Sequence, residues 1–247
     1  MRKLVATLAC RNDGSRLYGK PLQNLDIENR VTILDHIIDL IRTLKEINEI
    51  VLGISEGSAN QYYIDYAKEK GVKYIIGSQK DVLERLIQCV EHVNGTDAFR
   101  ITTESPFFYF EKVEEAWNKH ITCNNDLTSF SGVPDGCHFE LISLETLKKQ
   151  HDLGNERHRS EFCTLYLREN IEAFKIEVLD IPQKVMRYKD MRLTVDYPED
   201  LILCRCVYKH LKDYAPKIPL DKIIDFLDSR PDLQALVAPY VVATWVY

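Results

Sequence analysis

The sequence predicts an α/β fold built on a doubly wound, mostly parallel sheet. Short apolar runs that suit buried strands alternate with amphipathic stretches that suit helices, at a spacing of roughly 25 residues. A length of 247 residues suits one large domain with a sizeable core. Hydrophobic residues make up 45% of the chain, and it has only 10 glycines and 9 prolines, which excludes global disorder.

The first half of the chain carries the clearest pattern. An apolar run at 4–9 is typical of a strand buried on both faces of a parallel sheet. Thr32 is a candidate N-cap for a helix at 33–44, and Gly71 is expected to end a helix at 59–70. The other expected elements are strands at 50–54, 72–76 and 98–102 and helices at 81–93 and 112–121.

The pattern loosens at residues 131–190. Turn residues are followed there by expected helices near 143–151 and 160–170 and a strand at 174–179. This stretch is interpreted as a small inserted α+β arm, either a subdomain or a dimerisation arm, within a single domain of residues 1–247. A strand-like run at 191–195, a helix opened by Pro198 and two short helices are expected to follow. The aromatic run at 107–110 is expected in the core or at a subunit contact.

Charge and composition exclude several classes of partner. Lys and Arg total 32 against 38 Asp and Glu, a formal net charge of −6, so binding of nucleic acid through phosphate neutralisation is not expected. No stretch approaches the roughly 20 apolar residues of a membrane span, and the apolar start is too short for a secretory signal. The 7 scattered cysteines are interpreted as reduced thiols, and the expected location is the cytoplasm.

The loop after the first strand carries three cations, Arg11, Arg16 and Lys20, interspersed with glycines. Ligands of open α/β sheets bind beyond the carboxyl ends of the strands, where this loop must lie. Cations and close backbone approach suit a polyphosphate, although the loop matches neither the P-loop pattern nor G-x-G-x-x-G. A basic loop of this kind is also common as plain solvated surface, so both interpretations stay open.

A second candidate is the segment 192–201, which reads R-L-T-V-D-Y-P-E-D-L. Asp196 follows the expected strand and precedes a helix. One interpretation is that Asp196 binds Mg²⁺, which takes one or two carboxylates together with substrate phosphates. The other is helix capping, with Asp196 as N-cap and Glu199 as the third helical residue. Asp200 is either a supporting residue or a helix-start acid without a chemical role.

Together these segments resemble the cytidylyltransferases that make CMP-activated sugars, the CMP-Kdo and CMP-sialate synthetases, and most closely the spore coat polysaccharide biosynthesis protein F group. The first loop is similar to A-R-x-x-S-T-R-L-P-G-K, and 192–201 nearly reproduces R-L-T-V-D-T-P-E-D-L. Four further stretches are similar to family motifs, in the family order. Residues 81–85 match D-V-L-x-R, 100–106 align with R-I-T-G-D-x-P, and 134–140 and 159–161 are similar to P-D-G-x-x-x-E and R-E-H.

Four positions depart from the family pattern. Gly14 replaces a serine, with Ser15 as the neighbouring hydroxyl, and Tyr18 replaces a proline. The Gly-Asp pair becomes Thr103-Glu104, which keeps a carboxylate on a longer arm, and Phe162 stands in place of the R-E-H histidine. The resemblance is therefore firmer for the nucleotide half of the site than for the acceptor half.

The resemblance implies a Rossmann-like nucleotidyltransferase that moves CMP from CTP onto a sugar or sugar-acid acceptor, releases pyrophosphate and uses Mg²⁺. It also implies a homodimer. A phosphate or phosphonate acceptor, or an inactive nucleotide-binding homologue, are the alternatives.

The resemblance also implies roles for single residues. Four residues are candidates for catalysis: Arg11, Arg16, Lys20 and Asp196. The first three and Ser15 are also candidates for binding CTP, and Asp196 and Glu104 for binding the metal. Asp81 and Arg85 either bind the nucleotide, or Asp81 caps its helix and pairs with Arg85. Candidates for binding the acceptor are Glu140, Arg159 and Glu161.

Overall fold

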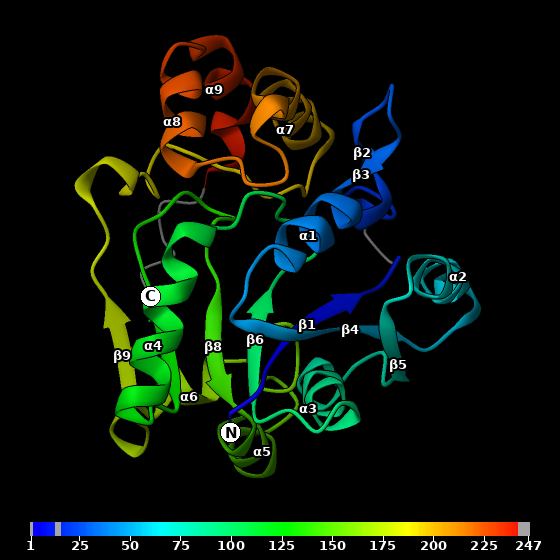
Figure 1. The fold of residues 1–247 in the computed structure, drawn as a ribbon, viewed down its shortest axis with the longest axis vertical. Coiled ribbons are helices and arrows are strands. Elements are labelled where there is room, and N and C mark those ends of the chain that lie inside the picture. The colour runs from blue at the N-terminus through cyan, green and yellow to red at the C-terminus, as the bar shows by residue number, and fades with distance from the viewer. Residues whose placement is uncertain (1, 13–15, 242–247) are drawn as a thin grey trace.

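The computed structural model describes residues 2–12 and 16–241. Its main sheet has the strand order β5-β4-β1-β6-β8-β7-β9 (Figure 1). All neighbouring strands pair in parallel except β8, which runs antiparallel to β6 and β7. The expected α/β fold with a mostly parallel sheet is confirmed. The strands are β1 (Leu4–Cys10), β4 (Ile47–Ser55), β5 (Lys73–Gly77), β6 (Asp97–Ile101), β7 (Leu127–Phe130), β8 (Glu140–Ser143) and β9 (Ile176–Leu179).

Helices cover both faces of this sheet. One face packs on α3 (Val82–His92), α5 (Leu144–Leu153) and α6 (Leu165–Glu169). The other packs on α1 (Ile33–Arg42), α2 (Gln61–Lys70) and α4 (Val113–Cys123). The C-terminal helices α7 (Pro198–Leu211), α8 (Leu220–Asp228) and α9 (Pro231–Val237) lie beyond one end of the sheet and join the same hydrophobic core (Figure 1). In β1, Val5 faces the first set, whereas Leu4 and Ala6 face the second. Burial on both sides explains why this strand is an unbroken apolar run.

The start of α1 follows the expected capping pattern. The Thr32 side chain accepts a hydrogen bond from the Asp35 backbone N–H at 3.0 Å, and the Asp35 carboxylate accepts from the Thr32 N–H at 3.0 Å. This reciprocal capping box satisfies N–H groups that have no partner inside the helix. At the end of α2, Gly71 adopts φ 62°, as the sequence predicts.

Residues 131–190 contribute β8 and β9 to the main sheet rather than forming a sheet of their own. The sequence analysis did not predict β7, β8 or the hairpin of β2 (Asn24–Asp26) and β3 (Val31–Thr32). These strands have only two to four residues each, too few to display an alternating pattern. A dimer contact through residues 131–190 stays a prediction.

The prediction of a strand at 191–195 is wrong. Its only described ladder contact is an isolated bridge between Arg192 and Asp135. The segment crosses above the sheet, where the N–H groups of Leu193 and Val195 donate to the carbonyls of Asp135 and Glu104 at 2.7 and 2.9 Å. All five residues of the segment are buried, so its apolar pattern reflects burial and not sheet pairing.

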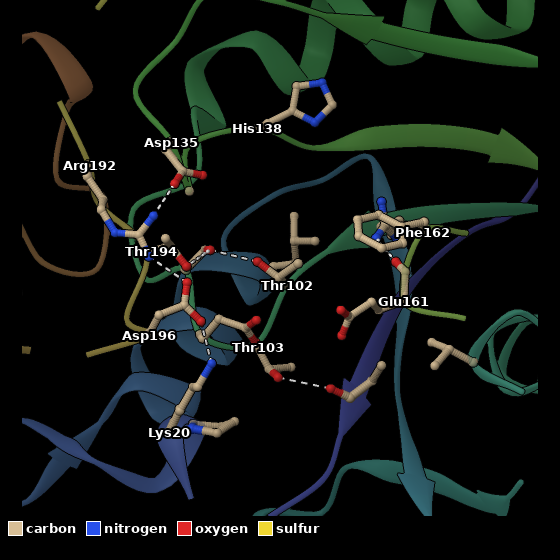
Figure 2. A pocket seen from close by; sticks show the side chains of 18 of the residues that line it. Lys20, Thr102, Thr103, Asp135, His138, Glu161, Phe162, Arg192, Thr194 and Asp196 are labelled. Carbon is tan, nitrogen blue, oxygen red and sulfur yellow. Dashed lines mark hydrogen bonds and ion pairs between the residues drawn. The ribbon is translucent and has the colours of Figure 1, made fainter. Parts of the chain in front are cut away.

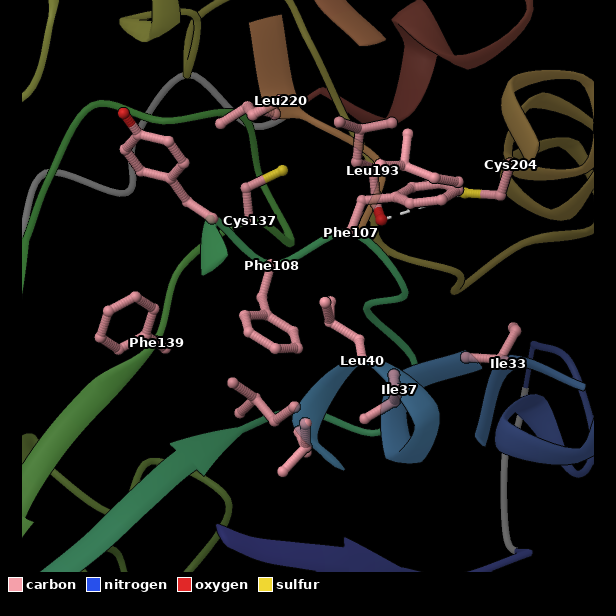
Figure 3. Close-up of a cluster of buried hydrophobic side chains, with 14 of the residues drawn as sticks. Ile33, Ile37, Leu40, Phe107, Phe108, Cys137, Phe139, Leu193, Cys204 and Leu220 are labelled. Atoms are coloured by element: carbon pink, nitrogen blue, oxygen red, sulfur yellow. Dashed lines mark hydrogen bonds between the residues drawn. The ribbon is translucent and has the colours of Figure 1, made fainter. Parts of the chain in front are cut away.

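The aromatic run at 107–110 lies in the core. Phe107 and Phe108 are 3% and 2% exposed, and Figure 3 shows them between α1 and the C-terminal helices. Leu193 and Leu220 pack into the same cluster. The C-terminal helices are thereby joined to the sheet through aromatic contacts.

All 7 cysteines are free, and five of them are buried. Across residues 2–12 and 16–241, no helix combines the length and the apolar character needed to cross a bilayer.

Gly136 lets two distant segments approach each other. It adopts φ 90°, and a Cβ there would lie 2.6 Å from the Thr194 backbone nitrogen. Gly71 also has a positive φ, 62°, but a Cβ there would meet nothing within 4 Å. Substitution of Gly71 therefore tests the effect of the positive φ alone, whereas substitution of Gly136 tests the positive φ and the steric overlap together.

We expect Gly136→Ala to lower the free energy of unfolding by about 3 kcal/mol, because backbone strain and overlap add. Gly71→Ala should cost only about 1 kcal/mol, the price of the left-handed conformation alone. Urea denaturation of both variants measures the difference. Equal losses would show that the approach of residues 136 and 194 does not constrain the fold.

Candidate active site

A cavity of about 910 Å³ opens beyond the carboxyl ends of β1 and β6 (Figure 2). This is the edge where open α/β sheets bind ligands. Residues from stretches far apart in the sequence line it: from 9–12, 16–21, 82–86, 100–105, 131–138, 161–168 and 188–197, together with Pro239 and Tyr240.

Asp196 is the point at which the first loop meets the late segment. Its Oδ1 accepts hydrogen bonds from Arg16 Nη2 at 2.8 Å and Lys20 Nζ at 2.5 Å. Its Oδ2 accepts from Arg192 Nη2 at 2.5 Å. Burial alone would raise the pKa of Asp196, but these three cations outweigh it and hold the pKa below its ordinary value. Asp196 is therefore ionised at neutral pH.

Arg192 holds Asp196 in place. Its side chain is 5% exposed, and besides Asp196 it donates to Asp135 at 2.5 Å and to Asp200 at 3.0 Å. Because a guanidinium offers its donors in a rigid plane, three carboxylates fix its orientation and it fixes theirs. Figure 2 shows Asp135, Arg192, Asp196 and Lys20 as a connected chain. The sequence analysis assigned Arg192 no role, although the late motif contains it.

The capping interpretation of Asp196 is wrong. Tyr197 is the N-cap of α7, and Asp200 is the third helical residue. Asp200 Oδ2 accepts from the backbone N–H groups of Asp196 and Tyr197, both at 2.9 Å. Since Asp200 satisfies the helix start, the Asp196 side chain is available to the cavity.

Glu104 brings a second carboxylate near Asp196. It follows β6, lines the cavity, and its carbonyl accepts from the Val195 N–H at 2.9 Å. Burial raises the pKa of Glu104, the negative charge of Asp196 raises it further, and the positive charge of Lys20 opposes both. A cation bound between the two carboxylates would relieve this repulsion.

Arg11 lies away from the Asp196 cluster. Its Nη2 donates to Glu161 Oε2 at 3.1 Å, and both residues line the cavity with exposed side chains. Phe162, which stands where the family has a histidine, also lines the cavity and is 47% exposed. Ser15, the fourth candidate of the first loop, lies outside the described residues.

Arg85 and Asp81 occupy different environments in the structure, and only Arg85 lies at the cavity. Arg85 lines the cavity and is only 1% exposed, with Nη1 donating to the Gly53 carbonyl at 2.9 Å. No described residue bonds its Nε. Asp81 does not line the cavity; it caps α3 through the Glu84 N–H at 2.8 Å and bonds His151 at 2.8 Å. Of the two, only Arg85 is placed to contact a ligand in the cavity.

Glu140 lies behind the cavity wall and holds two arginines that line it. It is 1% exposed, and it accepts from Arg100 at 2.6 Å and from Arg168 at 2.7 Å. Burial alone would raise the pKa of Glu140, but the positive charges of Arg100, His138 and Arg168 lower it to about 2. Arg168 was not named in the sequence analysis, because no motif marks it.

Arg159 is not placed for an acceptor. Its guanidinium donates to the His151 carbonyl at 2.9 Å, and it does not line the cavity. Its own carbonyl accepts from the Val82 N–H at 2.8 Å, which completes the start of α3. Of the three acceptor candidates, Glu161 lines the cavity, Glu140 supports it from behind, and Arg159 is structural.

The donor set fits a divalent cation that is shared with a substrate. Within residues 2–12 and 16–241, no group of three or more His, Cys, Asp or Glu side chains is arranged to hold a metal ion alone. Asp196 and Glu104 offer two carboxylates at the cavity. Mg²⁺ is typically held by one or two carboxylates, completed by water and substrate phosphates.

The fold and the cavity are those of a nucleotide-binding α/β protein, with cations from distant segments at the carboxyl edge of a parallel sheet. A family model described as "Cytidylyltransferase" matches residues 6–235. The chain belongs to this cytidylyltransferase family.

Individual relatives agree with this assignment. The chain is 24% identical over 234 residues to spore coat polysaccharide biosynthesis protein SpsF of Bacillus subtilis, covering 94% of this chain and 97% of that protein. A cytidylyltransferase structure from Leptospira borgpetersenii superposes with a TM-score of 0.84 at 18% identity and full coverage of both chains. A CMP:2-keto-3-deoxy-manno-octonic acid synthetase in complex with CTP superposes with a TM-score of 0.61 at 14% identity, covering 84% of this chain and 99% of that one.

We expect Glu140→Gln to lower the free energy of unfolding at pH 7 by about 3 kcal/mol, because it leaves two partly buried arginines without their carboxylate. The folded pKa of about 2 lies below the ordinary value of 4.5, so Glu140 contributes its stability above pH 4.5. That contribution is lost as the pH falls toward 2.

The measurement is urea denaturation of the Glu140→Gln variant and the wild type between pH 7 and pH 3, where the difference should shrink as the pH falls. Glu145→Gln is the matched control, because Glu145 is exposed in the first turn of α5. A difference that does not change with pH would contradict the ionised pairing of Glu140.

Proposed function

We propose that this protein transfers CMP from CTP to a sugar or sugar-acid acceptor, releases pyrophosphate and requires Mg²⁺. The observation that carries the proposal is the meeting of Lys20 and Asp196 at 2.5 Å, although 176 residues separate them. This contact brings the cations proposed to bind phosphate and the carboxylate proposed to bind the metal to one cavity. The CTP in a structurally similar synthetase supports the choice of nucleotide.

In the proposed reaction an acceptor oxygen attacks the α-phosphorus of CTP. A new P–O bond forms, the bond from the α-phosphorus to the oxygen bridging the β-phosphate breaks, and pyrophosphate leaves with that electron pair. A hydroxyl acceptor loses its proton to water in the same step. The protein needs to align the reactants and neutralise the phosphate oxygens. Arg16 and Lys20 reach the cavity beside Asp196, whereas Arg11 reaches it beside Glu161. Arg85 adds a buried cation at the cavity wall.

The charges around Asp196 suit this task. Three cations, Arg16, Lys20 and Arg192, face three carboxylates, Asp135, Asp196 and Asp200. A triphosphate would compete with Asp196 for Arg16 and Lys20, whereas Arg192 stays with its carboxylates. The negative charges of Asp196 and Glu104 would then be less compensated, which favours a divalent cation between them. Asp196 and Glu104 are the residues that would hold Mg²⁺, and Mg²⁺ would supply Lewis-acid neutralisation of the phosphates.

Arg100 and Arg168 form the proposed acceptor end of the cavity. Both guanidinium groups line the cavity and are held by the buried carboxylate of Glu140. Guanidinium groups held in this way suit the carboxylate of a sugar acid. The name of the SpsF relative, which refers to polysaccharide biosynthesis, supports a sugar acceptor.

The same pair of arginines favours a second candidate, a cytidylyltransferase for a phosphate or phosphonate acceptor, since a guanidinium binds these anions equally well. Gly14, in place of the family serine, motivates a third candidate, a homologue that binds nucleotide without turnover.

We expect Mg²⁺-dependent pyrophosphate release from CTP, and much less from ATP, GTP or UTP, when purified protein is incubated with a panel of acceptors. The panel contains sugar acids, phosphorylated sugars and phosphonates, and a coupled phosphate assay follows turnover. Equal use of purine triphosphates would contradict the proposal. Binding of CTP without turnover on any acceptor would favour the inactive homologue.

Asp196→Asn is the matched variant for this assay. Losing one electrostatic contact to the reacting phosphates should lower kcat by about 10²- to 10³-fold, by analogy with an oxyanion donor. The variant should still fold, because Asp200 caps α7 and Arg192 keeps Asp135 and Asp200 as partners. Its thermal stability should fall moderately, because Lys20 and Arg16 lose their carboxylate. Normal activity in the folded fraction of the variant would remove Asp196 from the mechanism.

We further expect Arg168→Gln to raise the KM for the acceptor by about 10- to 100-fold, the range for a hydrogen bond to a charged group. The KM for CTP should stay near its wild-type value. Arg157→Gln is the control, because Arg157 is 67% exposed and does not line the cavity. An equal rise in both KM values would place Arg168 outside the acceptor end.

A further inference from the structure

The C-terminal segment returns to the cavity beyond the part of the chain that the family model matches. That match ends at residue 235, yet Pro239 and Tyr240 line the cavity. Leu233 and Val237 anchor α9 in the core at 5% and 2% exposure. The short turn at Ala238–Tyr240 then carries Tyr240 to the start of α7. This wall of the cavity is therefore built by residues that the family pattern does not describe.

Tyr240 packs face to face on Tyr197. The two ring centroids are 4.0 Å apart and the ring planes differ by 12°. Tyr197 lies at the start of α7, next to Asp196. Tyr240 thus restrains the ring of Tyr197 from the side of the C-terminal segment.

Tyr197 in turn contacts Arg16. The Arg16 guanidinium carbon lies 4.9 Å from the centroid of the Tyr197 ring, and Arg16 Nη1 lies 3.5 Å from the Tyr197 hydroxyl. The Arg16 side chain is 45% exposed, so few contacts orient it. A triphosphate that draws Arg16 away from Asp196 leaves the aromatic face of Tyr197 as its remaining described support. A guanidinium over such a face is attracted by the ring electrons.

We propose that Tyr240 is a positioning residue for CTP binding, which acts through Tyr197 to orient Arg16 toward the triphosphate. This inference rests on the proposed function, since it takes CTP as the ligand. Tyr240 holds the Tyr197 ring, the ring holds the guanidinium, and Arg16 contacts the phosphates. The acceptor end of the cavity, at Arg100 and Arg168, lies outside this chain of contacts.

The test compares Tyr240→Leu with Tyr240→Phe in the full chain. Leucine removes the aromatic face, so the KM and Kd for CTP should rise by roughly 2- to 12-fold, the range of a single aromatic pair. The acceptor KM should not change. Phenylalanine keeps the stacked ring and loses only the hydroxyl, so its values should stay within about twofold of wild type.

Tyr214→Leu is the matched control, because Tyr214 is 48% exposed and does not line the cavity. Its CTP values should equal those of wild type. The inference is overturned if Tyr240→Leu behaves like Tyr214→Leu, if CTP and acceptor KM rise together, or if activity falls only in proportion to the folded fraction. Calorimetric titration of wild type with CTP separates the two proposals, because absence of CTP binding refutes the function itself.

Discussion

One carboxylate joins the two halves of the site. Arg192 donates to one oxygen of Asp196, and Lys20 and Arg16 donate to the other, so these two cations of the first loop are held against the late segment. Exposed ion pairs contribute little to stability, but the side chains of Asp196 and Arg192 are only 16% and 5% exposed. Where charges are this buried, leaving one unpaired is costly. The positions of the Arg16 and Lys20 side chains therefore depend on the Asp196 carboxylate.

The two ends of the cavity are organised in the same way. At each end, a buried charged side chain orients more exposed side chains of the opposite charge. At one end Arg192 sets the direction of Asp196, and at the other Glu140 sets the directions of Arg100 and Arg168. Groups oriented during folding need no rearrangement when a ligand arrives, which is the condition for strong electrostatic stabilisation of a reacting phosphate.

Backbone contacts outside the cavity help to orient Arg192 and Asp196. Because Gly136 has no side chain, the chain at residues 135–136 passes directly against 193–194, and Asp135 reaches Arg192. Asp200 takes over the capping of α7, which leaves Asp196 directed at the cavity. The contacts that allow the backbone segments to approach and that cap α7 therefore also orient the charged residues of the site.

Local sequence determined those features that depend on neighbouring residues: the buried run of β1, the Thr32 cap of α1 and the cations that follow β1. Tertiary structure alone decided that 191–195 crosses the sheet without joining it, that Glu140 lies behind the cavity wall, and that Arg168 lines it. The reason is physical. An apolar pattern reports that a segment is buried and not what it pairs with, and the direction of a charged side chain depends on partners far away in the chain.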